Sequence, residues 1–182
     1  PDGNSIVYAG FRGAETQNLH VRRLDDLAPK RLHEAGPART PCFSPDGKKL
    51  VLNNPTTEAR TWKRYKGGLA PDLYIYDFAA NTAEKITDYP GYDEFPMWFN
   101  DTIYFISDRV GGKMNVFAYD TKSKQTRQVT KFDEFDVKFP SLGPDALVFE
   151  NGGYLYVLDL PSEKLNKLVV EVPSDRIANR TE

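Results

Sequence analysis

The chain has 182 residues, of which 40% are hydrophobic and 27% are charged, and its formal net charge is −2. This is the composition of an ordinary globular protein, and the length allows one or two domains. Acidic and basic residues are interleaved, so the sequence provides no one-signed field that would attract nucleic acid or an anionic membrane. No apolar run approaches the roughly 18 residues of a membrane helix. We expect neither a nucleic acid nor a membrane as partner.

A repeat runs through the chain, and each unit reads turn, apolar strand, variable loop, second apolar strand, polar turn and charged strand. Ile6, Leu50, Ile103 and Leu147 are equivalent positions, at intervals of 44, 53 and 44 residues. A period in the forties with several short strands per unit is typical of a β-propeller. The expected strands, in chain order, lie within 1–10, 18–26 and 29–32; 44–54, 72–81 and 83–87; 99–108, 114–123 and 126–130; and 143–151, 153–162 and 163–168.

The middle strands of the units are apolar at consecutive positions, as in Ile103–Ile106 and Tyr154–Leu158. A sheet with one solvated face would alternate apolar and polar residues, so continuous apolar strands indicate sheets covered on both faces. Blades stacked side by side about an axis are covered in this way. The last strand of each unit is charged, as in Glu84–Thr87, which suits an outer edge strand.

Short segments rich in Pro and aromatic residues precede the apolar strands of three units. We interpret these segments as the innermost strands lining an axial channel, with each Pro at a strand start; they are 41–43, 95–99 and 139–142. The first unit begins at its Pro1-Asp2-Gly3 turn, without such a segment. The expected fold class is therefore all-β, a propeller segment of three complete four-stranded blades and one truncated blade.

The expected partial propeller spans residues 1–170, and 171–182 would link it to a following domain. A truncated blade cannot close a ring, so we expect the chain to be a fragment of a larger protein. The blades themselves are placed at about 1–32, 39–87, 94–130 and 137–170.

Catalytic and metal-binding residues are not evident in the sequence. Cys42 is the only cysteine, which excludes an intrachain disulfide and a cysteine-ligated zinc site. Ser44 stands in a Ser-Pro-Asp-Gly turn with no Gly-x-Ser-x-Gly elbow around it, and neither His20 nor His33 has an activated Ser as partner. We expect structural roles for Ser44 and His20, no catalytic residue and no cofactor.

Two acidic clusters, Asp93-Glu94 and Asp133–Asp136, raise the alternative of a calcium site. The Asp spacing and the Gly of a calcium loop are absent from both. Because the clusters occupy equivalent positions in successive units, we interpret them as the polar ends of segments that enter the innermost strands. No metal ion is expected.

The Ser-Pro-Asp-Gly repeat resembles TolB-like propellers, and the stretch Arg60–Gly68 (RTWKRYKGG) looks like the WK-x-Y-x-GG segment in the first propeller of tricorn-type proteases. That propeller is six-bladed, so the resemblance implies that this segment comes from a six-bladed ring. The similarity continues through Phe95–Trp98, Ile103–Asp108 and Val148–Gly153, and ends at Val172–Arg176. It covers essentially the whole chain. It implies a non-catalytic propeller of a large cytosolic serine peptidase that trims peptides and assembles as a homo-oligomer.

In such a peptidase the propeller would act as a conduit or filter for peptides, and the catalytic residues would lie in domains beyond this chain. The expected partners are peptides and the other domains and subunits of the protease. The expected location is cytoplasmic, with a periplasmic one left open because the chain opens without an initiator Met. The alternative, from a different class, is a non-enzymatic TolB-like propeller that docks a partner protein.

The loop from Arg60 to Gly68 provides the candidate substrate-binding site. In a four-stranded blade it shares a face with the connections Asp88–Glu94 and Lys131–Asp136. Cations and aromatic rings together can hold a peptide's carboxylate and backbone. The alternative is that Trp62 and Tyr65 fasten a long loop to neighbouring blades while the charges stay solvated. The candidate residues are Arg60, Trp62, Lys63, Arg64 and Tyr65.

Overall fold

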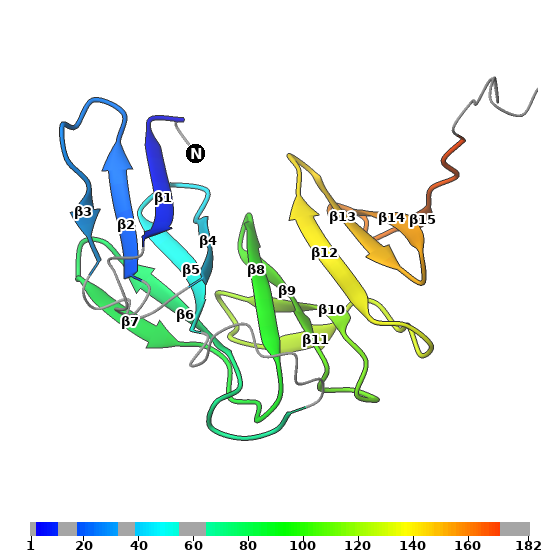
Figure 1. Cartoon of the computed structure of the whole chain (residues 1–182). Helices are drawn as coiled ribbons and strands as arrows, with labels where there is room; N and C mark the ends of the chain where they lie inside the picture. The colour runs from blue at the N-terminus through cyan, green and yellow to red at the C-terminus, as the bar shows by residue number, and fades with distance from the viewer. Residues whose placement is uncertain (1–2, 11–17, 33–38, 55–64, 172–182) are drawn as a thin grey trace, which may run out of the picture.

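The computed structural model describes residues 3–10, 18–32, 39–54 and 65–171. Their regular structure consists of strands, which form four separate antiparallel sheets that follow one another in an arc (Figure 1). In each sheet the strands are ordered as in the chain. None of these residues forms a helix long and apolar enough to span a bilayer.

The first sheet has three strands in the described residues, and each of the other three has four. The first contains β1 (Ser5–Gly10), β2 (Asn18–Arg23) and β3 (Lys30–Arg31). The second contains β4 (Arg39–Phe43), β5 (Lys49–Asn54), β6 (Asp72–Asp77) and β7 (Thr82–Lys85). The third contains β8 (Asp93–Phe99), β9 (Thr102–Ser107), β10 (Asn115–Asp120) and β11 (Thr126–Gln128). The fourth contains β12 (Val137–Leu142), β13 (Ala146–Asn151), β14 (Tyr154–Asp159) and β15 (Leu165–Lys167).

Each boundary between neighbouring sheets contains its own hydrophobic core. The side chains of Ile103 and Phe105 pack toward the second sheet, whereas those of Tyr104 and Ile106 pack toward the fourth. Successive residues of a strand point to opposite faces of its sheet, so a continuous apolar strand supplies two cores at once. This arrangement confirms, for Ile103–Ile106 in the third sheet, the inference that a continuous apolar strand is covered on both faces, and the fold is a β-propeller segment.

The two sheets at the ends of the arc are covered on one face. In the fourth sheet Phe149 is buried against the third, whereas Val148 and Leu155 are 38% and 42% exposed. In the first sheet Val7 packs toward the second sheet, whereas Ile6 and Tyr8 are 50% and 39% exposed. The expectation that Tyr154–Leu158 is covered on both faces is therefore wrong within this chain, because no sheet of the described residues stacks on that side.

The strands β4, β8 and β12 are the first strands of their sheets and lie next to one another. The backbone N–H of Trp98 on β8 donates a hydrogen bond to Cys42 Sγ on β4 at 3.3 Å. The strand β8 also contacts β12. At the opposite end of each complete sheet the short strands β7, β11 and β15 are mostly exposed and carry charged or polar residues, as an outer edge requires.

The innermost strands contain a β-bulge at equivalent positions, and here the sequence interpretation needs correction. The pairing register shifts between Arg39 and Cys42, between Glu94 and Met97, and between Lys138 and Ser141. The prolines at 41, 96 and 140 lie inside these bulges rather than at strand starts, because a bulge frees a proline from the ladder hydrogen bond that it cannot donate.

The residue before each of these prolines has a positive φ: 44° at Thr40, 53° at Phe95 and 51° at Phe139. A non-glycine residue held in this region costs on the order of 1–3 kcal/mol. Since the same geometry recurs in three sheets, the bulge belongs to the blade, and what varies between blades is the side chain that it presents.

Candidate functional site

Of the predicted peptide-contact residues, Arg60, Trp62, Lys63 and Arg64 lie outside the described residues, so their role stays a prediction. Tyr65 is described and half-buried. His33 also lies outside the described residues.

The described end of the loop and the residues after it, Tyr65–Pro71, lie against the connection between the second and third sheets. The N–H of Gly67 donates to the carbonyl of Pro90 at 2.8 Å, and the N–H of Asp93 donates to the carbonyl of Pro71 at 3.2 Å. Gly67 has a φ of 151°, and a β-carbon on residue 67 would lie 2.5 Å from the Tyr65 hydroxyl oxygen. Tyr65 therefore packs over its own loop end, which agrees with a fastening role for this residue.

Ser44 and His20 have structural surroundings. Ser44 Oγ accepts a hydrogen bond from the N–H of Lys49 at 2.9 Å and lies 2.7 Å from Asp46 Oδ1, while Gly47 has a φ of 70°. Ser44 thus closes a hairpin turn. The ring of His20 stacks on Tyr8, with centroids 5.5 Å apart. Both side chains take the structural roles expected from the sequence.

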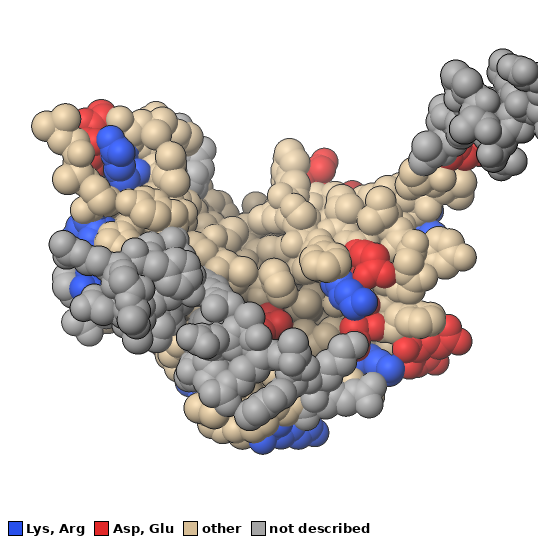
Figure 2. Space-filling model, viewed as in Figure 1, with Lys and Arg blue, Asp and Glu red and all other residues tan. Residues whose placement is uncertain are grey.

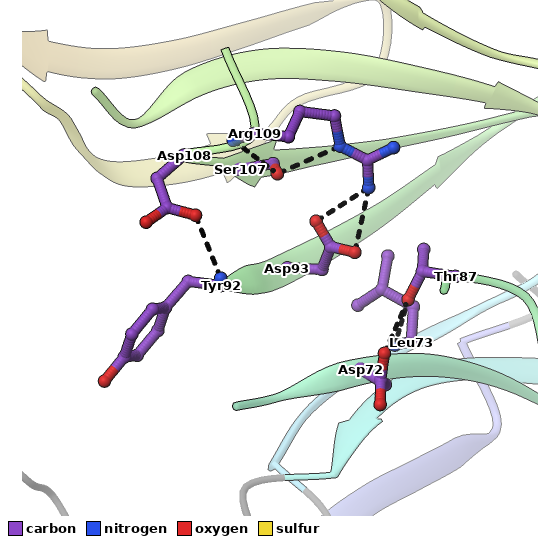
Figure 3. Close-up of polar contacts among 8 residues, drawn as sticks. All are labelled: Asp72, Leu73, Thr87, Tyr92, Asp93, Ser107, Asp108 and Arg109. Atoms are coloured by element: carbon purple, nitrogen blue, oxygen red, sulfur yellow. Dashed lines mark hydrogen bonds and ion pairs between the residues drawn. The ribbon is translucent and has the colours of Figure 1, made fainter. Parts of the chain in front are cut away.

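Asp93 anchors the start of β8 in a buried ion pair (Figure 3). The side chain of Asp93 is fully buried, and Arg109 Nη2 donates to its two carboxylate oxygens at 2.8 and 2.9 Å. Burial raises the pKa of the Asp93 carboxyl above its usual range, and the Arg109 guanidinium opposes that rise. Arg109 Nε also donates to Ser107 Oγ at 3.1 Å.

The guanidinium of Arg109 is enclosed by aromatic rings. Its central carbon lies 5.3 Å from the ring centroid of Tyr89 and 5.2 Å from those of Phe105 and Phe117. Cation–π attraction therefore adds to the ion pair in a largely desolvated place. The acid at 93, one member of the clusters considered for calcium, thus pairs with an arginine of its own sheet, beside rings of the core that faces the second sheet. Among the described residues no group of three or more His, Cys, Asp and Glu could hold a metal ion.

The adjacent residue Asp108 faces the other side of the third sheet. The Asp108 Oδ1 atom accepts a hydrogen bond from the N–H of Tyr92 at 3.0 Å (Figure 3). Asp108 as a whole is 4% exposed. A β-carbon on Gly91 would lie 2.5 Å from this oxygen and 2.4 Å from Tyr89 Cε1. Glycine at 91 therefore permits the close turn that places Tyr92 and Asp108 together.

A cavity of about 250 Å³ opens between the innermost strands β8 and β12. Its apolar wall includes Ile106 and Met114, and the two bulge residues Phe95 and Phe139 also line it. Its polar lining contains three carboxylates and one lysine, namely Glu94, Asp108, Asp136 and Lys138. We refer to this feature as the β8–β12 cavity.

The carboxylates and the lysine of the β8–β12 cavity are held by neighbours. Asp136 Oδ1 accepts from the N–H of Met114 at 3.1 Å. The Lys138 ammonium lies 4.0 Å from Glu150 on β13. Among the described residues that line the cavity, acidic side chains outnumber basic ones and lie next to apolar surface. On the face shown in Figure 2, acidic and basic side chains are otherwise interspersed, and the surface is hollowed between the first and fourth sheets.

The sequence interpretation missed this cavity as a site. It placed the 95–99 and 139–142 segments on the channel and Asp136 at the entry to a strand. It did not predict that these residues line one cavity. The available signal was an aromatic residue followed by Pro at equivalent positions of two successive units, Phe95-Pro96 and Phe139-Pro140.

Comparison with known proteins shows which family has this sequence and fold. Residues 1–164 match the family model of the tricorn protease N-terminal β-propeller domain. A tricorn protease homolog of Saccharolobus solfataricus is 34% identical over 127 residues, which cover 70% of this chain and 12% of that protein. The tricorn protease of Thermoplasma acidophilum is 27% identical over 184 residues, which cover 97% of this chain and 16% of that protein. The chain thus spans 12% and 16% of the lengths of these two relatives.

Solved structures agree on the fold. The crystal structure of the tricorn protease aligns with a TM-score of 0.60 at 21% identity, covering 97% of this chain and 22% of that chain. TolB of Acinetobacter baumannii aligns with a TM-score of 0.72 at 21% identity, covering 92% of this chain and 41% of that chain. At these identities the likeness establishes the propeller fold alone.

Proposed function

Because the chain belongs to the family of tricorn protease N-terminal β-propeller domains, we propose that it frames a channel that admits extended peptides to a serine protease and excludes folded chains. The chain is a propeller part of a tricorn-like protease. In the proposed division of labour the propeller selects by width, and catalysis takes place in domains that this chain does not include.

The arrangement of the innermost strands supports this proposal most directly. The strands β4, β8 and β12 are the first members of three successive sheets and contact one another in sequence. Each has a sheet partner on one side, so its other edge carries backbone groups that face the inside of the arc. A completed ring would surround an opening with such edges, which suit an extended chain and offer no room to a folded domain.

Other parts of the same protein are the proposed partners at the two ends of the arc. The apolar residues exposed there, Ile6 and Tyr8 on the first sheet and Val148 and Leu155 on the fourth, are the residues that further blades would cover. We further propose that these blades close a six-bladed ring. The whole protein would assemble into a homo-oligomer and take peptides as substrates.

A bulky group attached inside the arc tests the channel. Ser141 is an exposed residue of β12, and Thr126 is an exposed residue of the outer strand β11. In the whole protein that contains this chain, with Cys42 replaced by Ala, Ser141→Cys coupled to a large maleimide reagent should strongly reduce turnover of a fluorogenic peptide. The same reagent on Thr126→Cys should leave turnover unchanged. Equal turnover of the two conjugates would refute a channel through this propeller.

The alternative, a propeller that docks a partner protein without passing peptides, has the TolB-like fold in its favour. It predicts that neither conjugate alters peptide turnover. The conjugate experiment therefore separates the two functions.

A further inference from the structure

We propose that the β8–β12 cavity binds an apolar side chain, of the size of leucine or phenylalanine, from an extended peptide. This inference rests on the proposed function, which brings peptides to the inner side of the arc, and it adds a preference among side chains. Four features support it: the size of the cavity, the core that forms its wall, the exposed ring of Phe139, and the partners that the polar groups of the lining already have.

The size of the cavity limits its occupant. At about 250 Å³ it lies below the roughly 300–1,000 Å³ typical of pockets for drug-sized ligands, whereas an apolar cavity of about 150 Å³ already holds a benzene-sized group. A single side chain therefore fits it better than a whole cofactor. The cavity lies between β8 and β12, each of which ends its sheet on the inner side. An extended peptide beside such an edge could insert one side chain.

The wall of the cavity is continuous with the hydrophobic core between the third and fourth sheets. Ile106 and Val137 belong to this core, and Phe95 and Met114 pack against it. All four residues line the cavity. An apolar side chain placed there would extend the core and would remove apolar surface from water on both partners, so the contact is favourable in proportion to the area that it covers.

Phe139 also lines the cavity, and its conformation has a cost. The residue is 77% exposed and has a φ of 51°, a region that non-glycine residues seldom occupy. The bulge itself does not require an aromatic ring, because the equivalent position in β4 is Thr40, with a φ of 44°. A large apolar ring that is held in a strained backbone conformation and left open to solvent indicates a functional contact.

The polar groups of the lining have partners inside the protein. Asp108 and Asp136 each accept a hydrogen bond from a backbone N–H. Asp136 has a further interaction, and Glu94 has one of its own. The Lys138 ammonium lies 4.0 Å from a carboxylate oxygen of Glu150. What remains to be covered in the cavity is therefore mainly its apolar surface.

The charges of the lining disfavour an acidic occupant. Among the described residues that line the cavity, three are acidic and one is basic. An aspartate or glutamate side chain, or the terminal carboxylate of a peptide, would approach this excess of negative charge and would lose its water. A polar uncharged side chain would exchange its hydrogen bonds with water for apolar contacts. A neutral apolar side chain avoids both costs.

The test uses three short peptides of equal length and the whole protein that contains this chain. Each peptide consists of Ala, Ser and Gly, carries fluorescein, and has Leu, Asn or Asp at its centre, three side chains of nearly the same shape. Binding is measured by fluorescence anisotropy before appreciable cleavage, and cleavage is then followed by chromatography. We expect the Leu peptide to bind about tenfold more tightly than the Asn peptide, the lower end of the ratio that complete burial of a leucine gives. The Asp peptide should bind more weakly than the Asn peptide.

Removal of the Phe139 ring should reduce this preference. Asn adopts a positive φ more readily than most residues, so Phe139→Asn keeps the bulge and loses the ring. The ratio between the Leu and Asn peptides should fall at least about threefold, because part of the apolar lining is gone. Phe139→Gly, which also tolerates this φ, is the second variant. The matched control is Phe135→Asn, which removes a 55% exposed phenylalanine outside the cavity and should keep the ratio. Hydrogen–deuterium exchange of the β12 amides verifies that the fold is kept.

The outcomes separate this inference from the proposed function. Equal binding of the Leu and Asn peptides, an unchanged ratio in both Phe139 variants, or an equal loss in Phe135→Asn overturns the site for an apolar side chain; continued cleavage of the peptides would at the same time keep the proposed function. Absence of both binding and cleavage overturns both. Displacement of the Leu peptide by an equal concentration of N-acetyl-leucine amide would show a site for small apolar molecules and overturn the extended peptide as occupant.

Discussion

The boundary between the second and third sheets and the boundary between the third and fourth are built from the same repeat but are closed differently. At the first of these boundaries the acid Asp93 is fully buried and meets Arg109 among three aromatic rings. At the second, the residue equivalent to Asp93 is Val137, and the carboxylates Asp108 and Asp136 line an open cavity instead. The side chains of the neighbouring residues Asp108 and Arg109 thus lie toward opposite faces of the third sheet.

The difference shows how a repeated scaffold can separate stability from recognition. A buried acid with its own arginine has its charge satisfied inside the protein. The carboxylates at the other boundary line an open cavity instead. The following substitutions test this contrast, from the largest expected effect to the smallest.

Arg109→Ala should cost most, because it leaves the fully buried Asp93 carboxylate without its cation. Removing one partner of a buried pair destabilises by about 3–5 kcal/mol. Hydrogen–deuterium exchange of the β8 and β9 amides in the whole protein measures the loss. Lys122→Ala, which breaks the exposed pair with Asp101, is the control and should leave the exchange rates nearly unchanged.

The pH dependence of Arg109→Ala follows from the sign of the shift at Asp93. Burial already raises the pKa of this carboxyl in the folded protein, and without Arg109 it rises further. An acid whose folded pKa lies above its unfolded value lowers stability as pH rises between the two, with the full loss above the folded pKa. The cost of the substitution should therefore shrink on acidification. An equal cost at acidic and neutral pH would contradict the role assigned to Asp93.

Gly91→Ala should have an intermediate effect, because the new β-carbon would lie 2.4 Å from Tyr89 Cε1 and 2.5 Å from Asp108 Oδ1. Overpacking of this kind costs about 1–3 kcal/mol. It should also displace Asp108, and hydrogen–deuterium exchange of the β8 amides in the whole protein measures the loss of stability. Gly68→Ala is the matched control, since no atom lies within 4 Å of its β-carbon position. Unchanged exchange in Gly91→Ala would argue against the tight turn.

Glu163→Gln should have the smallest effect, at the outer edge of the third and fourth sheets. Arg127 donates to Glu163 Oε2 at 2.7 Å, and the Tyr104 hydroxyl lies 2.9 Å from Oε1. Because the arginine side chain is 56% exposed, we expect a loss of about 1 kcal/mol or less.

The Arg127 guanidinium lowers the pKa of Glu163, so this contribution is present above the unfolded pKa and is lost as pH falls through the folded one. Exchange rates of β10 and β14 amides in Glu163→Gln should converge with those of the unchanged protein at acidic pH. Rates that differ equally at every pH would exclude the ion pair as their cause.

The fold was largely predictable because the residue pattern that produces it can be recognised within individual strands. Consecutive apolar residues such as Ile103–Ile106 require two covered faces, and the repeat supplies the neighbouring sheets. The position of the prolines was not predictable in the same way. Pro96 reads as a strand start from sequence alone, because the bulge that accommodates it depends on the pairing with β9.

The candidate site was less predictable than the fold. The β8–β12 cavity joins Phe95 and Phe139, which come from different units, and its charge depends on which of two adjacent residues faces which boundary. Asp108 and Arg109 are indistinguishable by pattern from an ordinary charged turn after a strand. Only the stacking of sheets separates the two side chains.

The division of each strand between two cores has a mechanical consequence. Residues that adjoin in sequence, such as Phe105 and Ile106, contribute their burial to different seams of the arc. Loosening one seam would therefore leave the packing of the next one largely intact, and the segment that moves would be a whole sheet. A pore bordered by such segments could change its aperture by small rotations at its seams, without any strand unfolding.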